Sequence, residues 1–291
     1  MTERRRPPRP RVAVVLGGGG ARGLAHVGVL EGLCELGIES CAVVGVSMGA
    51  VVGATYAVRD DWSERLRGSN WERLPVVNEA REGDALERLS AYARSARRLA
   101  PAVTRWSWRR GFSDSARDTL IDLLGEDTTF EDCRVPFAAV ATDLRAGKRV
   151  VLDEGSLVEA VLASASIPGL AAPIEHDGAS LVDGGFVDPA PVDVAHALGA
   201  DRVVACHVGI PPLSDDTVDN WVSVLLHAAE AGQRSFASVR FRHADHVLRP
   251  DFLARVRMLD FSGVQAIIDA GRVCVEEAAE DLLRLADAPA A

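Results

Sequence analysis

The chain has 291 residues, and 48% of them are hydrophobic, which is enough apolar surface for a substantial buried core. Its formal net charge of −10 argues against nucleic-acid binding, because phosphate affinity depends on clustered Lys and Arg. The five cysteines are scattered and show no CxxC spacing, which favours reduced thiols in the cytoplasm and gives no indication of a metal site.

The first ten residues, MTERRRPPRP, form a basic, proline-rich segment that cannot bury apolar surface. We expect residues 1–10 to be a disordered arm and residues 11–285 to form one domain. The short apolar run after the arm is too brief for the hydrophobic region of a signal peptide. The uncharged stretch 42–58 is shorter than the roughly 20 residues that a bilayer-spanning helix needs. The sequence therefore predicts a cytoplasmic protein.

The first part of the domain predicts two strand–turn–helix units. Residues 12–16 form a β-branched run that ends in glycines, and residues 24–36 carry apolar side chains at helical spacing. Residues 41–46 are a second apolar strand, followed at once by a helix over 48–58. Repeated units of this kind indicate a parallel sheet covered by helices.

Residues 60–112 differ in composition, with many Arg, several Trp and no clear strand. We interpret this segment as an insertion that covers one end of the sheet. Regular elements are expected beyond it, as helices at 114–124, from about 156, at 221–239 and within 261–285, and as strands at 137–142, 149–152, 180–182 and 203–207.

A run of glycines connects the first strand to the first helix. The loop GGGGARG spans residues 17–23, where bare backbone N–H groups and the helix dipole favour binding of an anion. It also matches the GxGxxG pattern of dinucleotide-binding folds, which requires an acidic residue at the end of the second strand. Glu39 has the right separation but precedes that strand. The sequence therefore disfavours a nicotinamide or flavin cofactor.

The second strand ends in GVSMG at residues 45–49, which has the GxSxG pattern of a nucleophile elbow. Small residues in this pattern permit a tight strand-to-helix turn that exposes the hydroxyl of Ser47. Ser is also a favoured helix N-cap, and the structural and catalytic interpretations of Ser47 are compatible. If Ser47 is a nucleophile, the backbone N–H of Met48 is positioned as one oxyanion donor.

A serine nucleophile needs a base. Of the seven histidines, only His176 stands in a turn of the kind that can present a triad histidine, although its Asp-Gly neighbours more often indicate a surface hairpin. Asp183 is a sharper candidate, because it follows a strand and opens the sequence DGG, whose glycines permit close approach to another loop. An Asp before glycines is also a common turn residue.

Four motifs occur in order along the chain: GGGGARG, GVSMG, SASIPG at residues 164–169, and DGG. Together they resemble the patatin-like phospholipase family, and more closely its bacterial and neuropathy-target-esterase-type branch, over residues 12–209. The resemblance implies a three-layer α/β/α sandwich with a largely parallel central sheet. It also implies hydrolysis of acyl esters of phospholipids, lysophospholipids or related lipids, with no cofactor and no metal.

The same resemblance implies a Ser–Asp dyad in which Ser47 is the nucleophile and Asp183 the base. It also implies an oxyanion hole in the glycine loop, for which we name Gly18, Gly19, Gly20 and Arg22, together with Met48. Arg22 has two interpretations of equal weight, as a charge for the oxyanion or a head-group phosphate and as a structural ion pair.

The sequence WSWRR at residues 106–110 combines aromatic and basic side chains, which suit a membrane–water interface. We hypothesise that this segment is a lid or a membrane-docking edge, with peripheral contact at the inner membrane surface. A helix that simply covers the core is the alternative. Two other functions also stay open, a Ser-His-Asp triad esterase and a non-catalytic regulatory protein on the same fold.

Overall fold

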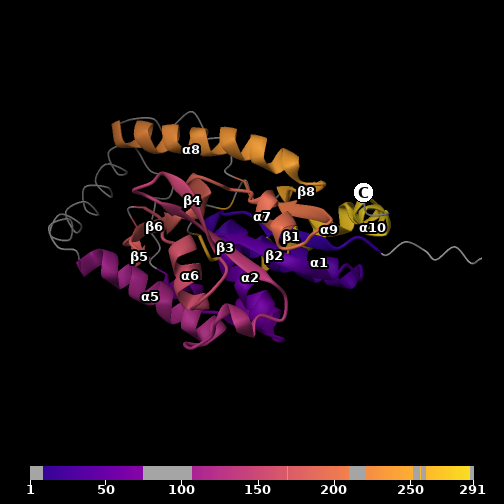
Figure 1. The fold of residues 1–291 in the computed structure, drawn as a ribbon, viewed down its shortest axis with the longest axis horizontal. Coiled ribbons are helices and arrows are strands. Elements are labelled where there is room, and N and C mark those ends of the chain that lie inside the picture. Colours follow the sequence, from indigo (N-terminus) through magenta and orange to yellow (C-terminus); the bar gives the residue numbers. More distant parts are fainter. Residues whose placement is uncertain are drawn as a thin grey trace, which may run out of the picture.

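A mixed eight-stranded sheet forms the centre of the molecule (Figure 1). The computed structural model describes residues 9–74, 107–168, 170–209, 221–251, 256 and 260–288. The strands lie in the order β5-β6-β3-β2-β1-β7-β8, with β4 beside β3, and helices cover both faces of the sheet. The predicted three-layer α/β/α fold is therefore confirmed.

The strands are short, and most of them run parallel. Their bounds are β1 (Val12–Leu16), β2 (Ser40–Val46), β3 (Phe137–Asp143), β4 (Lys148–Leu152), β5 (Ile174–His176), β6 (Ala179–Asp183), β7 (Arg202–Cys206) and β8 (His246–Leu248). Strands β3, β2, β1, β7 and β8 run parallel, whereas β4, β5 and β6 join through antiparallel pairs. Sequence analysis missed β5 and β8, whose three residues are too few to show a period.

The helices begin and end close to their expected positions. They are α1 (Ala25–Glu35), α2 (Met48–Val58), α3 (Trp62–Gly68), α5 (Ser107–Leu124), α6 (Leu157–Ser164), α7 (Val192–Ala197), α8 (Trp221–Arg240), α9 (Val264–Glu277) and α10 (Ala279–Asp287). Several details differ from the expectation, and α3 and α7 were not predicted at all. Helix α5 begins at Ser107 and not at residue 114, and the amphipathic stretch 261–285 contains two helices separated by Ala278.

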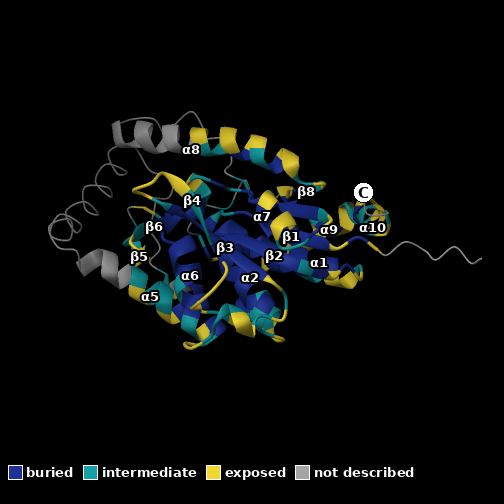
Figure 2. Ribbon diagram, in the orientation of Figure 1, coloured by how far each residue is buried: buried dark blue, intermediate teal, exposed yellow. Residues whose placement is uncertain are grey.

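Alternate residues of the parallel strands face two separate cores, as the two-residue period of a strand dictates. Val14 and Leu16 of β1 belong to the larger core, which also contains side chains of α1, α2, α5, α6 and α9. Ala13 and Val15 belong to the smaller core beneath α7 and the end of α8. Figure 2 shows this layering, with the sheet buried and much of the second half of α8, residues 231–240, exposed.

Strands β2 and β6 pair with the same side of β3, one after the other along its length. The last residue of β2, Val46, lies opposite Val140 of β3. The last residue of β6, Asp183, lies opposite the next β3 residue, Ala141, and β6 runs antiparallel to β3. Strand β4 pairs with β3 residues that also pair with β2 or with β6, so β4 lies on the opposite side of β3 from those two strands. Strands β2 and β6 therefore approach each other end to end.

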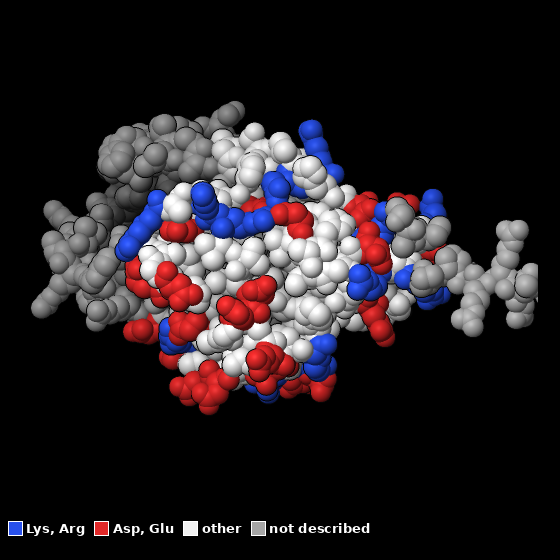
Figure 3. Space-filling model, viewed as in Figure 1, with Lys and Arg blue, Asp and Glu red and all other residues white. Residues whose placement is uncertain are grey.

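A buried carboxylate ties α8 to the sheet. The side chain of Asp188 is only 4% exposed and pairs with Arg149 of β4 at 2.7 Å and with Arg240 of α8 at 2.6 Å. Asp193 of α7 contacts the same two guanidinium groups but is 54% exposed. Lys and Arg side chains form a band across the upper part of the face in Figure 3, in the region of β4 and α8. The two aspartates give this basic region its counter-charge.

Several expectations concern segments outside the described residues. They include residues 1–8 of the predicted arm, residues 75–106 of the predicted insertion with Trp106 among them, and the side chain of Trp108. At the edge of the described part, Arg9 pairs with Asp287 of α10 at 3.2 Å. Among the helices that the structure describes, none is long and apolar enough to cross a bilayer.

Replacing Asp188 with Ala should lower the free energy of unfolding by about 3 kcal/mol, because two mostly shielded arginines lose a buried partner. The matched Asp193→Ala variant removes an exposed partner of the same arginines and should lose no more than about 1 kcal/mol. Urea denaturation of both variants measures the difference. Equal losses would show that burial of Asp188 does not set the strength of these contacts.

Candidate active site

Ser47 occupies the turn between β2 and α2. Its backbone angles are φ 55° and ψ −124°, a conformation that residues other than glycine rarely adopt. A Cβ on Gly45 would lie 2.4 Å from the Cα of Ala50, and one on Gly49 would lie 2.1 Å from the carbonyl oxygen of Leu16. Close backbone contacts therefore require both glycines of the GxSxG pattern, and the turn has the geometry that the pattern predicts.

The end of α6 holds this turn in position. The hydroxyl of Ser164 accepts a hydrogen bond from the backbone N–H of Ser47 at 3.0 Å and donates one to the carbonyl oxygen of Val140 at 2.7 Å. The nearby Ser166 hydroxyl donates instead to Leu162, four residues earlier. Both serines are buried, and the hydroxyl groups of both bond to the backbone. The contact between Ser164 and the nucleophile turn could not be seen in the sequence.

Asp183 ends β6 and is buried beside Ser47. Its Oδ1 accepts a hydrogen bond from the backbone N–H of Gly185 at 2.8 Å, and the hydroxyl of Thr142 fixes its carbonyl oxygen at 2.8 Å. Burial raises the pKa of Asp183 to about 6, although hydrogen bonds from the Ser47 side chain and from Gly185 oppose the rise. The structure thus brings together the two residues predicted as nucleophile and base.

The glycine loop lies against the Ser47 turn. A Cβ on Gly18 would be only 3.2 Å from the Cβ of Ser47, so the backbone passes unusually close to the nucleophile. Gly20 has φ 57° and lines the same pocket as Ser47 and Met48. At Gly19, a Cβ would lie 2.5 Å from the side chain of Val208. Gly18, Gly20 and Met48, which were predicted for the oxyanion hole, therefore lie at the predicted nucleophile, whereas the contact that constrains Gly19 is with Val208.

Two buried basic side chains brace the glycine loop. Nε of Arg22 donates to the carbonyl oxygen of Gly19 at 3.3 Å. Nε2 of His26, in α1, donates to the carbonyl oxygen of Gly17 at 2.7 Å. Burial lowers the pKa of His26 to about 4, which keeps the ring neutral near pH 7. This role of His26 was not predicted, and its place three residues after the loop is the one signal for it in the sequence.

The histidines do not assemble a triad in the described structure. Among the six histidine side chains that the structure describes, none hydrogen-bonds to Ser47 or Asp183. His176 ends β5, and the next two residues, Asp177 and Gly178, have positive φ in the hairpin turn to β6. This turn lies at the surface, as the Asp-Gly sequence favours.

An apolar pocket opens beside Ser47. Its walls include Met48, Trp71, Leu120, Leu162, Ile167 and Phe261. A larger and shallower hollow of about 460 Å³ lies near Ser40 and Pro136, where β2 and β3 begin. The larger hollow lies where β2 and β3 begin, whereas Ser47 follows the end of β2 and Asp183 ends β6. The apolar pocket, which Ser47 lines, is therefore the one next to these two residues.

The family model for patatin-like phospholipases matches residues 14–196, a span that contains both Ser47 and Asp183. An uncharacterized NTE family protein of Mycobacterium tuberculosis is 37% identical over 201 residues, which are 67% of this chain and 48% of that protein. Patatin-like phospholipase domain-containing protein 7 of Mus musculus is 33% identical over 218 residues, covering 72% of this chain and 15% of that protein. The chain thus spans half or less of the length of these curated relatives.

Two solved structures are similar at low sequence identity. VipD from Legionella pneumophila has a TM-score of 0.46 at 16% identity, covering 91% of this chain and 67% of that chain. Human GIVD cytosolic phospholipase A2 has a TM-score of 0.44 at 13% identity, covering 95% of this chain and 58% of that chain.

Ser164→Ala should lower the free energy of unfolding by about 1–3 kcal/mol, because the buried N–H of Ser47 and the carbonyl oxygen of Val140 both lose their partner. Any activity that depends on Ser47 should fall with it. The matched Ser166→Ala variant removes only the hydrogen bond to the carbonyl oxygen of Leu162, four residues earlier. It should therefore lose less stability and less activity than Ser164→Ala. Denaturation curves and rates for the two variants test this, and equal losses would argue against a special role for Ser164.

Proposed function

This chain belongs to the patatin-like phospholipase family, and from that premise we propose that it is a serine acyl hydrolase that cleaves lipid carboxylic esters through a dyad of Ser47 and Asp183. One observation carries the proposal. The buried carboxyl of Asp183, whose pKa burial raises to about 6, lies close enough to the Ser47 side chain for that side chain to oppose the rise, and Ser47 lines an apolar pocket. This combination supplies a nucleophile, a base and a site for an acyl chain.

In the proposed reaction, the hydroxyl oxygen of Ser47 attacks the ester carbonyl while Asp183 accepts the hydroxyl proton. The tetrahedral intermediate collapses to an acyl-serine, and Asp183 returns the proton to the leaving alcohol. Water then attacks the acyl-serine, Asp183 takes one of its protons, and the free fatty acid leaves as Ser47 regains its proton. A carboxylate with a pKa of about 6 is a better base than one with an ordinary pKa and is still ionised at pH 7.

The developing oxyanion needs hydrogen-bond donors, for which we propose backbone N–H groups. The N–H of Met48 begins α2, and those of Gly18, Gly19 and Gly20 lie in the adjoining loop. Arg22 contributes through its contact with the Gly19 carbonyl, which orients this loop. Donors of this type typically contribute about 3–4 kcal/mol each to transition-state stabilisation.

The substrate class follows from the pocket and the family. An apolar wall beside Ser47 suits the acyl chain of a phospholipid, a lysophospholipid or a related ester. We further propose that the protein acts in the cytoplasm and meets its substrate by peripheral contact with a membrane surface.

Ser47→Ala and Asp183→Asn should each reduce ester hydrolysis by roughly 1,000-fold or more, because one lacks the nucleophile and the other cannot accept its proton. The matched control is Asp177→Asn in the β5–β6 turn, where the side chain is exposed, and it should keep full activity. Hydrolysis of p-nitrophenyl esters, phospholipid and lysophospholipid provides the measurement.

The two alternative functions give different results in the same assay. A triad esterase would lose nearly all activity on replacement of a single histidine and would tolerate Asp183→Asn better. A non-catalytic protein would show no hydrolysis that depends on Ser47. Undiminished turnover by Ser47→Ala would contradict the dyad outright.

The rate constant kcat/KM should rise with pH through about 6 and level off above it, because only ionised Asp183 can accept the proton. Stability should change in the opposite sense. The raised pKa means that ionisation of Asp183 costs folding free energy, and this cost is absent below about pH 4 and complete above about pH 6. Asp183→Asn should therefore gain unfolding free energy relative to wild type between pH 4 and 8, by at most about 3 kcal/mol. A flat difference across that range would show that the pKa of Asp183 is not raised.

A further inference from the structure

Among the described residues that line the pocket beside Ser47, only Ser47, Thr119 and Trp71 carry polar side-chain groups. The hydroxyl of Thr119, which lines the pocket, donates to the carbonyl oxygen of Ser115 at 2.9 Å. The ring nitrogen of Trp71, in another wall, donates to the carbonyl oxygen of Leu66 at 2.9 Å. The donor of each of these two side chains is therefore already engaged within the protein. The pocket therefore suits an unbranched hydrocarbon chain and disfavours a hydrated head group.

Two stacked aromatic rings form part of this wall. Trp71 and Phe261 lie with ring centroids 5.7 Å apart and ring planes 9° apart. Trp71 is 3% exposed and Phe261 is 8% exposed. The two residues are far apart in sequence, so the wall exists only while their segments are held together. Stacked rings are stiff and bulky, and together they limit the space available to a chain.

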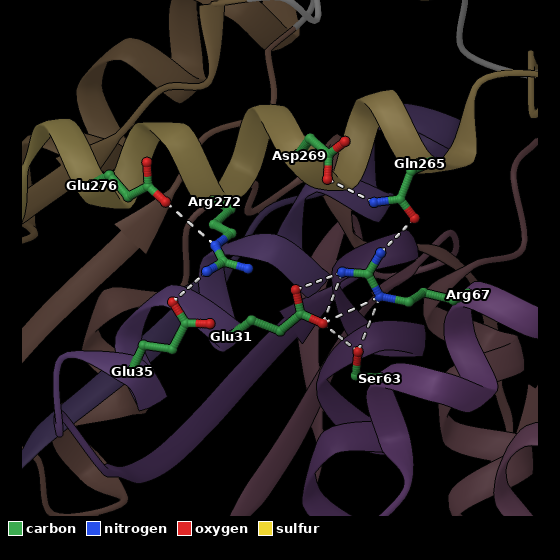
Figure 4. Close-up of polar contacts among 8 residues, drawn as sticks. All are labelled: Glu31, Glu35, Ser63, Arg67, Gln265, Asp269, Arg272 and Glu276. Atoms are coloured by element: carbon green, nitrogen blue, oxygen red, sulfur yellow. Dashed lines mark hydrogen bonds and ion pairs between the residues drawn. The ribbon is translucent and has the colours of Figure 1, made fainter.

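A polar clamp holds the two segments together (Figure 4). Arg67, at the end of α3, pairs with Glu31 of α1 at 2.7 Å and donates to the side-chain oxygen of Gln265 in α9 at 2.6 Å. Arg67 lies four residues before Trp71, and Gln265 lies four residues after Phe261. The hydrogen bond between Arg67 and Gln265 therefore joins the two segments that carry the rings.

We propose that the stack of Trp71 and Phe261 sets the length of the acyl chain that the site accepts, and that Arg67 is a positioning residue for this stack. The proposal rests on the acyl-hydrolase function proposed above and specifies its substrate. The pocket has a volume of about 70 Å³. A pocket of this size leaves little room for a long chain, so we expect wild-type protein to prefer shorter acyl chains over long ones.

The first test compares hydrolysis of p-nitrophenyl esters with four to sixteen acyl carbons. Trp71→Ala and Phe261→Ala should both move the preferred length to longer chains, and loss of the indole frees room for roughly four further carbons. Trp71→Phe is a milder variant that should move the preference by less. Each methylene that a pocket cannot seat reduces kcat/KM by roughly tenfold.

Phe130→Ala is the matched control for the aromatic variants. Phe130 also stacks on a buried ring, that of Phe137, with centroids 5.9 Å apart and planes 15° apart, and neither residue lines the pocket. Its loss should lower stability and leave the preferred chain length unchanged. The proposal is overturned if Trp71→Ala and Phe261→Ala hydrolyse esters with the wild-type preference, or if Phe130→Ala shifts the preference as they do.

The second test separates positioning by Arg67 from general stabilisation. Arg67→Met keeps the hydrocarbon stem but removes the clamp, and it should broaden the range of accepted lengths. Arg67→Lys should restore part of the selectivity. Arg272→Met is the control, because Arg272 of α9 also contacts α1, through Glu35 at 2.9 Å, and pairs within its own helix with Glu276 at 3.3 Å (Figure 4). An equal broadening in both methionine variants would overturn the role of Arg67.

A binding measurement distinguishes failure of this proposal from failure of the catalytic one. Saturated fatty acids of the same lengths are titrated against Ser47→Ala protein, with and without Trp71→Ala, by displacement of a fluorescent fatty acid. A shift toward longer acids supports the role of the stack even if no ester is hydrolysed. Unchanged length dependence overturns it even if Ser47 proves to be the nucleophile.

Discussion

The site depends on the pairing of β2 and β6 along the same side of β3. Strand β3 pairs first with β2 and then, on the same side, with β6, so that Val46 and Asp183 lie opposite consecutive β3 residues. Because β2 and β6 run toward each other, their last residues meet. Ser47 follows Val46 directly, and Asp183 is itself the end of β6. The register of two strand pairs thus brings the proposed nucleophile and the proposed base together.

Such a meeting of strand ends demands close backbone contact. A Cβ on Gly184 would lie 2.1 Å from the carbonyl oxygen of Val140, and the same oxygen accepts the hydroxyl of Ser164. The bond from Ser164 to the N–H of Ser47 then fixes the strained turn. Tight packing also excludes water from Asp183, and this burial raises its pKa to about 6. One constraint therefore gives the site both its geometry and a base suited to neutral pH.

Much of this site could be predicted from the sequence, because its parts are encoded in short stretches. GxSxG and DGG carry glycines because the backbone passes very close to other segments there, and such requirements leave a visible pattern. Ser164 and the pair of Trp71 and Phe261 act through side-chain contacts between distant segments, which no local pattern records. The strands β5 and β8 were missed for a related reason, since their partners and not their sequences define them. The hypothesis of a membrane-docking edge around Trp106 and Trp108 concerns side chains outside the described part and stays a prediction.

The electrostatic coupling between Asp183 and Ser47 is the centre of the proposed mechanism, and covalent labelling examines it without dependence on a particular substrate. Wild-type and Asp183→Asn proteins are treated with a fluorophosphonate, and the modified residue and its rate of modification are followed by peptide mass spectrometry from pH 5 to 8. We expect a single adduct on Ser47 whose rate rises through about pH 6 in wild type and is nearly lost in Asp183→Asn. An adduct on another residue, or equal rates in the two proteins, would contradict the dyad.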